Sequence, residues 1–158
     1  ADNGGQNLVF SRLNFSELVS DALLPFEPVY FEKGLTLDSG VEENLFVKGS
    51  QQHLKQAADI LLDNASKYAS ADSTVRVILR RQGSHCLLSV ASAGDAISRE
   101  DLKNIFKRFY RMDKARSMNH SYGLGLSIED SIVSKHGGKI WAESADGVNT
   151  FFVQLPAV

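Results

Sequence analysis

The chain has 158 residues, 43% of them hydrophobic, which is enough for the core of one domain of ordinary size. Its 17 basic and 19 acidic residues leave a net charge of −2, so no strong positive field marks it as a nucleic-acid-binding protein. The single cysteine, Cys86, excludes an internal disulfide and a zinc site built on several cysteines. No apolar run reaches the ~18–20 residues that cross a bilayer, so we expect no direct membrane contact. From the net charge we expect no nucleic-acid partner.

The N-terminal third of the chain predicts one bent helix between short strands. Asn14, with Glu17 three residues later, is an N-cap signature. Pro25 and Pro28 should bend or shorten the helix that follows, and Gly34 should end it. The predicted strands cover residues 8–15, 35–37 and 45–47, the last two around a polar turn.

The middle of the chain predicts a long helix followed by a hairpin. Over residues 51–68, apolar side chains recur every three or four positions and form one stripe. Alternating residues predict a strand over 75–80, and Gly83 then turns the chain. A more apolar run over 86–90 leads back as the second strand of the hairpin.

The C-terminal part combines a long charged segment with a helix and two closing strands. Residues 92–122 show little apolar periodicity, and a loop of that length in a compact domain is usually functional, often a lid. Residues 99–122 hold seven basic and three acidic residues, a net +4. A helix is predicted over 123–136, and strands over 140–143 and 150–155.

This pattern predicts a fold of helices and strands, α/β in the broad sense and α+β in the strict one. Helices alternate with strands that pair as hairpins, so we expect a two-layer sandwich. Its mixed, mostly antiparallel sheet should pack on about three helices.

Three side chains near the end of the long helix share one face, namely Asn64, Lys67 and Tyr68. They offer an amide oxygen able to ligate magnesium, an ammonium for phosphate and an aromatic face for a purine. Taken alone, the same pattern fits a solvated helix edge with Tyr68 in the core.

Two glycine segments flank the charged stretch. Gly94 follows a predicted buried strand, where a glycine lets a ligand approach the backbone, although alone it is simply a turn. The G-L-G-L run of residues 123–126 opens a helix, whose free amides and dipole favour phosphate. A charge run is usually a solvated surface, but a cationic lid between two glycine turns suits a polyphosphate.

Five segments taken together resemble the ATP-binding catalytic domain of sensor histidine kinases. In chain order they are LLDNASKY, SAGDAI, IFKRFYRMD, YGLGLSI and KHGGKIW. The resemblance implies the Bergerat fold over residues 8–158, with an ATP lid at about 94–122. Residues 1–7 would be a disordered end or a linker.

The resemblance also implies roles for individual residues. Asn64 would hold magnesium through ATP, Lys67 would contact phosphate and Arg111 would reach the terminal phosphate, which makes these three the expected catalytic residues. Tyr68 would cover the adenine face. Phe109 would help Phe106 and Tyr110 to anchor the lid. The other nucleotide-binding positions would be Ser92, Gly94, Ile97, Phe106, Tyr110, Gly123, Leu124, Gly125, Leu126 and Thr150.

A protein-histidine kinase of this family transfers the γ-phosphoryl group of ATP to a histidine, a reaction that needs mainly positioning and charge neutralisation. The implied partners are a histidine-bearing dimerisation domain of the same parent protein and a response regulator, in two-component signalling. The implied location is the cytoplasm, in a parent protein anchored in the cell membrane. None of the four histidines stands in the family's acceptor context, so we expect a fragment that is inactive alone. These histidines are His53, His85, His120 and His136.

The sequence departs from the family pattern at the proposed site. Ile60 stands where the family usually has a first asparagine, and an aliphatic side chain cannot ligate a metal. Ser92 replaces the aspartate that accepts a hydrogen bond from adenine, and Ala96 replaces the second glycine of that segment. Asn149 replaces a family-typical glycine, with a smaller expected effect. We therefore expect ATP affinity of roughly tens to hundreds of micromolar; the alternative is a degenerate domain that keeps the fold, binds ATP poorly or not at all, and acts through protein contacts.

Overall fold

The structure is a computed structural model that describes residues 9–110 and 121–158, without the side chains of 121–124. The expected linker at residues 1–7 and the central part of the expected lid, residues 111–120, lie outside the described residues. In the described part, no helix is both long and apolar enough to span a membrane.

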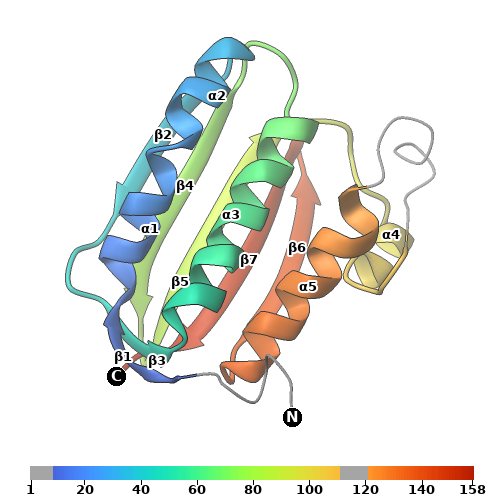
Figure 1. The fold of residues 1–158 in the computed structure, drawn as a ribbon. Helices are drawn as coiled ribbons and strands as arrows, with labels where there is room; N and C mark the ends of the chain where they lie inside the picture. Colours follow the sequence, from blue (N-terminus) through green and yellow to red (C-terminus); the bar gives the residue numbers. More distant parts are fainter. Residues whose placement is uncertain (1–8, 111–120) are drawn as a thin grey trace.

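Twelve helices and strands make up this part of the chain (Figure 1). They are β1 Ser11–Asn14, α1 Phe15–Leu23, α2 Phe26–Glu32, β2 Thr36–Val41, β3 Phe46–Gly49, α3 Gln51–Tyr68, β4 Thr74–Gln82, β5 His85–Ala93, α4 Arg99–Asn104, α5 Ser121–Lys135, β6 Lys139–Ala145 and β7 Val148–Pro156.

The elements form two layers, as the sequence predicts. A five-stranded sheet has the order β2-β4-β5-β7-β6, in which only β2 and β4 are parallel. Helices α1, α3 and α5 lie side by side over one face of this sheet (Figure 1). A separate ribbon of β1 and β3 closes the lower end. The expected fold class, a mixed and mostly antiparallel sheet on about three helices, is confirmed.

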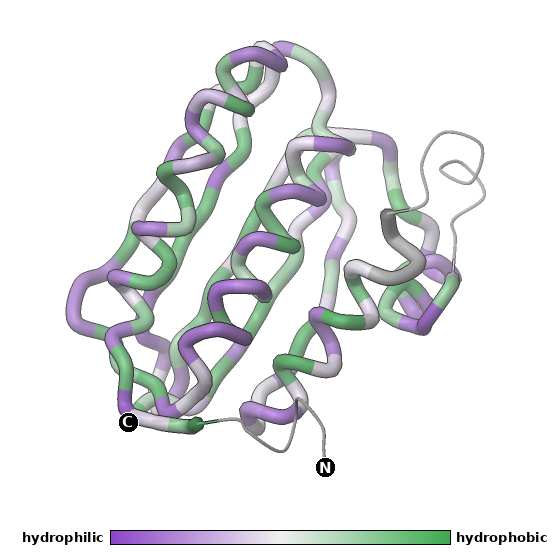
Figure 2. Tube along the Cα trace, in the orientation of Figure 1, coloured by the Kyte–Doolittle hydropathy of each residue, from purple (hydrophilic) through white to green (hydrophobic). Residues whose placement is uncertain are grey.

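Capping and patterning explain the helices that position the site. Asn14 accepts a hydrogen bond from the Glu17 N–H at 3.0 Å and starts α1, as predicted. Ser50 caps α3 in the same way, through the His53 N–H at 3.3 Å. Hydrophilic and hydrophobic residues alternate along α3 at the helical period (Figure 2), and its apolar stripe is buried against the sheet. Tyr30 of α2 donates to the Leu62 carbonyl at 2.6 Å and fastens the two helices together.

Two elements differ from the prediction. The strands around residues 35–37 and 45–47 do not pair with each other: β2 lies parallel to β4, and β3 pairs with β1. A parallel pair needs a crossover connection, which α3 supplies here. Helix α4 lies inside the segment expected to be a loop, and Ser98 caps it by accepting from the Asp101 N–H.

Candidate functional site

Asn64 lies in the last turns of α3, between two cavities. Asn64 is only 7% exposed, and it lines both cavities. A largely buried amide that borders two hollows offers a hydrogen-bond donor and an acceptor to a ligand there. The position of Asn64 between the cavities is therefore the strongest indication of a binding site.

The inner cavity lies between α3 and the sheet. Register brings its strand residues together, because Ser92 of β5 pairs with Asn149 of β7. The volume is about 10 Å³, close to the minimum for one water molecule, so a purine would need the walls to move apart. The lining residues are Leu61, Asn64, Ala65, Tyr68, Val90, Ser92, Asn149 and Phe151.

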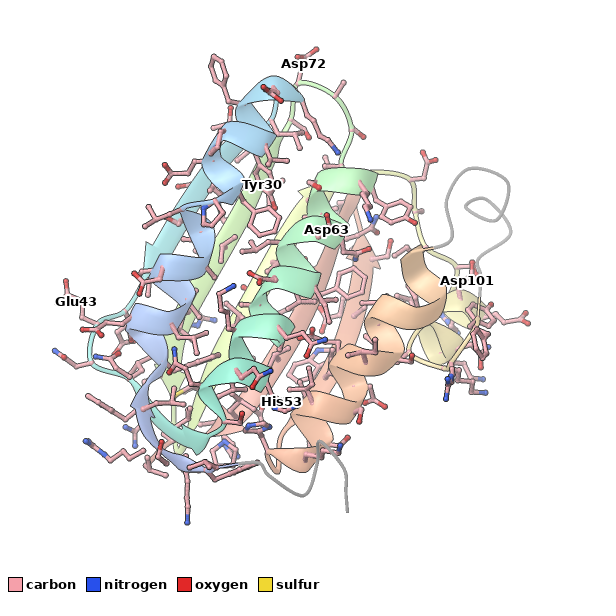
Figure 3. All side chains as sticks on the ribbon, viewed as in Figure 1. Tyr30, Glu43, His53, Asp63, Asp72 and Asp101 are labelled. Carbon is pink, nitrogen blue, oxygen red and sulfur yellow. The ribbon has the colours of Figure 1, made fainter. Side chains whose placement is uncertain are left out.

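The outer cavity, of about 70 Å³, lies between α3 and the beginning of α5. Ile60, Asp63 and Asn64 line it from α3, and Gly125 and Leu126 line it from α5. A Cβ atom on Gly125 would stand 3.7 Å from the Ile60 side chain, so the two helices approach closely here. Asp63, labelled in Figure 3 on the same part of α3, was not expected to contribute.

The donor groups at the outer cavity fit a hard cation. Asn64 and Asp63 offer oxygen atoms there, and magnesium prefers oxygen ligands while it keeps several waters. Lys67 pairs with Asp63 at 3.0 Å, which brings an ammonium to the same place. Nowhere in the described ranges, this cavity included, does a group of three or more His, Cys, Asp or Glu side chains lie so that it could hold a metal ion.

Hydrogen bonds link β6, β7 and the connection after β5 at the edge of the inner cavity. Asn149 accepts from the Ser144 hydroxyl at 2.6 Å and donates to the Asp95 carbonyl at 2.9 Å. The Ser144 hydroxyl in turn accepts from the Ile97 N–H at 3.0 Å. A Cβ atom on Gly94 would stand 3.1 Å from the Tyr68 carbonyl, so the chain after β5 passes close to the end of α3 here and a side chain would crowd it.

Two of the three side chains expected to anchor the lid, Phe106 and Tyr110, make contacts with other parts of the domain. Phe106 packs edge to face on Phe151, which lines the inner cavity, with ring centroids 6.2 Å apart. Tyr110 donates a hydrogen bond to Asp101, and this bond is the main reason that the pKa of the phenol rises to about 12. Phe109 is 66% exposed and therefore does not serve as an anchor.

The structure brings only part of the expected nucleotide site together. Asn64, Tyr68 and Ser92 meet at the inner cavity, and Gly125 and Leu126 join Asn64 at the outer one. Ile97 is buried but does not line the inner cavity, and Gly94 lies beside it. Gly123 and Leu124 lie in the first turn of α5, and Arg111 lies outside the described residues.

Thr150 lies on the opposite face of the sheet. It pairs with Ala91, whereas its neighbours Asn149 and Phe151 line the inner cavity. Side chains two residues apart on a strand share a face, so counting back from the apolar Phe151 would have predicted Asn149, and not Thr150, as the residue of β7 at the site.

Three cations of the expected lid lie apart from the inner cavity. Lys103, Lys107 and Arg108 line a hollow of about 930 Å³ between α4 and α5. Asp130 and two serines line it from the α5 side.

Comparison with known proteins agrees with this geometry. Residues 49–158 match the family model described as histidine kinase-, DNA gyrase B- and HSP90-like ATPase. Sensor protein DltS of Streptococcus agalactiae is 32% identical over 147 residues, which cover 93% of this chain and 37% of DltS. The sensor-like histidine kinase SenX3 of Mycobacterium tuberculosis is 33% identical over 144 residues, with 89% and 35% covered. The chain thus spans little more than a third of these relatives.

Solved structures give the same result. The mycobacterial sensor histidine kinase MprB superposes with a TM-score of 0.82 and 28% identity, over 93% of this chain and 98% of that one. The catalytic domain of histidine kinase ThkA gives 0.82 and 25%, over 94% and 97%. The chain therefore belongs to the histidine kinase-, DNA gyrase B- and HSP90-like ATPase family, as the catalytic domain of a sensor histidine kinase.

Proposed function

We propose that this domain binds magnesium–ATP along a path from the inner to the outer cavity and presents its γ-phosphoryl group to a histidine on another domain. The observation that carries the proposal is the position of Asn64, which is largely buried and lines both cavities. A nucleotide that spans the two cavities would contact its amide. The purine would enter the inner cavity beside Tyr68, and the phosphates would lie at the outer cavity.

The groups at the outer cavity suit phosphoryl transfer. Lys67 is 35% exposed at its side chain and would turn from Asp63 to the phosphates. Gly125 lies in the first two turns of α5, where backbone amides and the helix dipole favour anions. Bound magnesium would neutralise phosphate charge, and Asn64 would hold it, with the Asp63 carboxylate as a second oxygen donor. Ile60 supplies no donor, which favours a metal held mainly through the nucleotide.

The lid would complete the site. We assign it to about residues 94–122, within a catalytic domain of residues 8–158. Phe106 would couple lid movement to the inner cavity, because it packs on Phe151. Arg111 would reach the terminal phosphate when the lid closes.

The partners follow from the reaction. The acceptor would be a histidine on a dimerisation domain of the same parent protein, and the phosphoryl group would pass to a response regulator. Histidine kinase ThkA has been solved in complex with the response regulator protein TrrA. The domain would act in the cytoplasm, in a parent protein anchored in the membrane. The degenerate alternative has no support from the relatives named above, which are called sensor proteins or histidine kinases.

Titration calorimetry with AMP-PNP tests the proposal. The wild-type domain should bind the nucleotide more tightly with magnesium than with EDTA, and Asn64→Ala should weaken binding about 5–150-fold, since one buried hydrogen-bonding group is worth about 1–3 kcal/mol. Gln52→Ala, at an exposed position in the first turn of α3 outside both cavities and outside the lid, is the control and should bind like the wild type. Absence of binding at millimolar nucleotide would contradict the proposal and leave a domain that acts through protein contacts.

A further inference from the structure

The polar side chains that line the inner cavity are all uncharged. Its eight lining residues include one tyrosine, one serine and two asparagines, and neither a carboxylate nor a cation. Asp95 is near in sequence, but it contributes its backbone carbonyl to Asn149 and does not line the cavity. The groups that would face the edge of a base are therefore Ser92 and Asn149.

Both of these groups are able to donate and to accept hydrogen bonds. An asparagine amide has two N–H donors and an acceptor oxygen with two lone pairs. Asn149 uses one N–H on Asp95 and one lone pair on Ser144, so one donor and one acceptor position remain. The Ser92 hydroxyl makes no hydrogen bond within the described ranges, and a hydroxyl rotates to donate or accept as required.

Adenine and guanine differ in the hydrogen bonds that their edges offer. Adenine presents a donating 6-amino group, and guanine presents an accepting 6-oxo group. A carboxylate, which only accepts hydrogen bonds, would pair with the 6-amino group of adenine and leave the 6-oxo group of guanine unpaired. Binding sites discriminate strongly when one of two ligands leaves a buried polar group unpaired. A hydroxyl and an amide satisfy either edge.

We infer that this cavity does not select between adenine and guanine, so that the domain binds ATP and GTP with similar affinity. The inference rests on the proposed function, because it places the purine in the inner cavity. It names the substrate class as purine nucleoside triphosphates rather than ATP alone. Ser92 is then the specificity-determining position, since it lies next to Asn149 in the sheet register and has no other partner in the described part of the chain.

The test compares AMP-PNP with GMP-PNP by titration calorimetry in the presence of magnesium. The wild-type domain should bind both with dissociation constants within about fivefold of each other. Ser92→Asp places an acceptor-only group in the cavity and should raise the preference for AMP-PNP at least tenfold, mainly by weakening GMP-PNP. Ser84→Asp adds the same charge at the exposed turn before β5 and should leave the ratio unchanged.

The possible results are distinct. A wild-type preference of tenfold or more for AMP-PNP overturns the inference and leaves the proposed function intact, as does a Ser92→Asp variant that keeps the wild-type ratio. Binding of neither nucleotide by the wild type overturns both. If Ser92→Asp does not fold, Asn149→Asp introduces the carboxylate from the neighbouring strand, and the same rise in preference is expected.

Discussion

Glu129 is a single residue whose burial has a measurable cost. It lies in α5 one turn beyond Gly125, is fully buried, and neither carboxyl oxygen has a hydrogen-bond partner among the described residues. Burial without a partner disfavours the charged form and raises the pKa of this carboxyl well above its usual value. The folded domain therefore carries Glu129 as a neutral acid over a pH range in which the unfolded chain has already lost the proton.

The sign of the pH dependence follows. Above the unfolded pKa of about 4.5 and below the folded pKa, the folded state binds more protons, so the free energy of unfolding falls as the pH rises. Glu129→Gln keeps the shape and removes the ionisation. We expect it to remove this contribution to the slope and to make the domain more stable than the wild type at pH 7.

Urea unfolding between pH 4.5 and 7.5 measures this effect. Asp130→Asn removes a carboxylate from the next position, which lines the hollow between α4 and α5, and should leave the wild-type slope in place. An unchanged slope in Glu129→Gln would show that the carboxyl finds a partner in solution.

At the scale of elements, a hydrogen bond from Tyr110 to Asp101 joins α4 to the end of the described segment that follows it. It ties the last described residue before the lid's central part to a helix of only six residues. Hydrogen bonds to charged groups contribute about 1.5–3 kcal/mol when buried, and this one is partly exposed. Its loss should therefore loosen the segment locally without unfolding the domain.

Tyr110→Phe tests this role with limited trypsin digestion. Cleavage after Lys107 and Arg108 should become several times faster, while the melting temperature stays within about 2 °C of the wild type. Phe31→Leu, at a ring of α2 that is 82% exposed, is the control and should be cleaved at the wild-type rate. Unchanged cleavage in Tyr110→Phe would mean that Phe106 and Ile105 alone hold the root of the lid.

At the scale of the whole molecule, local signals in the sequence predicted most elements but not how they pair. Asn14 and the apolar stripe of α3 specify helices within a few residues of themselves, and both predictions are confirmed. The pairing of β2 with β4 depends on where the chain enters the sheet after α3. That position is a property of the whole fold and cannot be read from a short segment of sequence. The S-x-x-D signature at Ser98 was present and would have predicted α4, but the charge of the segment favoured a loop.

The site was predictable to a similar extent. Asn64 and Tyr68 share a helix face, so helical periodicity brings them together, and Ser92 follows from the end of a strand. The contribution of Asn149 depends on the β5–β7 register, and that of Asp63 on the antiparallel approach of α5 to α3. Both are tertiary properties that become visible only when distant segments meet.

His136 joins three distant parts of the molecule and gives a last prediction. At the end of α5 it donates to the Ile132 carbonyl at 2.7 Å, accepts from the Ser50 N–H at 3.0 Å, and stacks on Phe10 with centroids 4.6 Å apart. It therefore fastens α5 to the beginning of α3 and to the N-terminal segment. Burial, with the nearby His53 as a smaller cause, lowers the pKa of the imidazole below its usual 6.5.

Protonation of His136 would replace the accepting nitrogen with a donor that faces the Ser50 N–H, so the neutral form belongs to the folded state. As the pH falls below 6.5, the unfolded chain binds the proton first, and stability falls until the folded pKa is reached. His136→Gln, which keeps an acceptor without titrating, should flatten the decline in melting temperature between pH 6.5 and 5, whereas His85→Gln, on β5 away from this junction, should retain it. If both variants decline as the wild type does, another group causes the acid sensitivity, and the junction at His136 is not titrating.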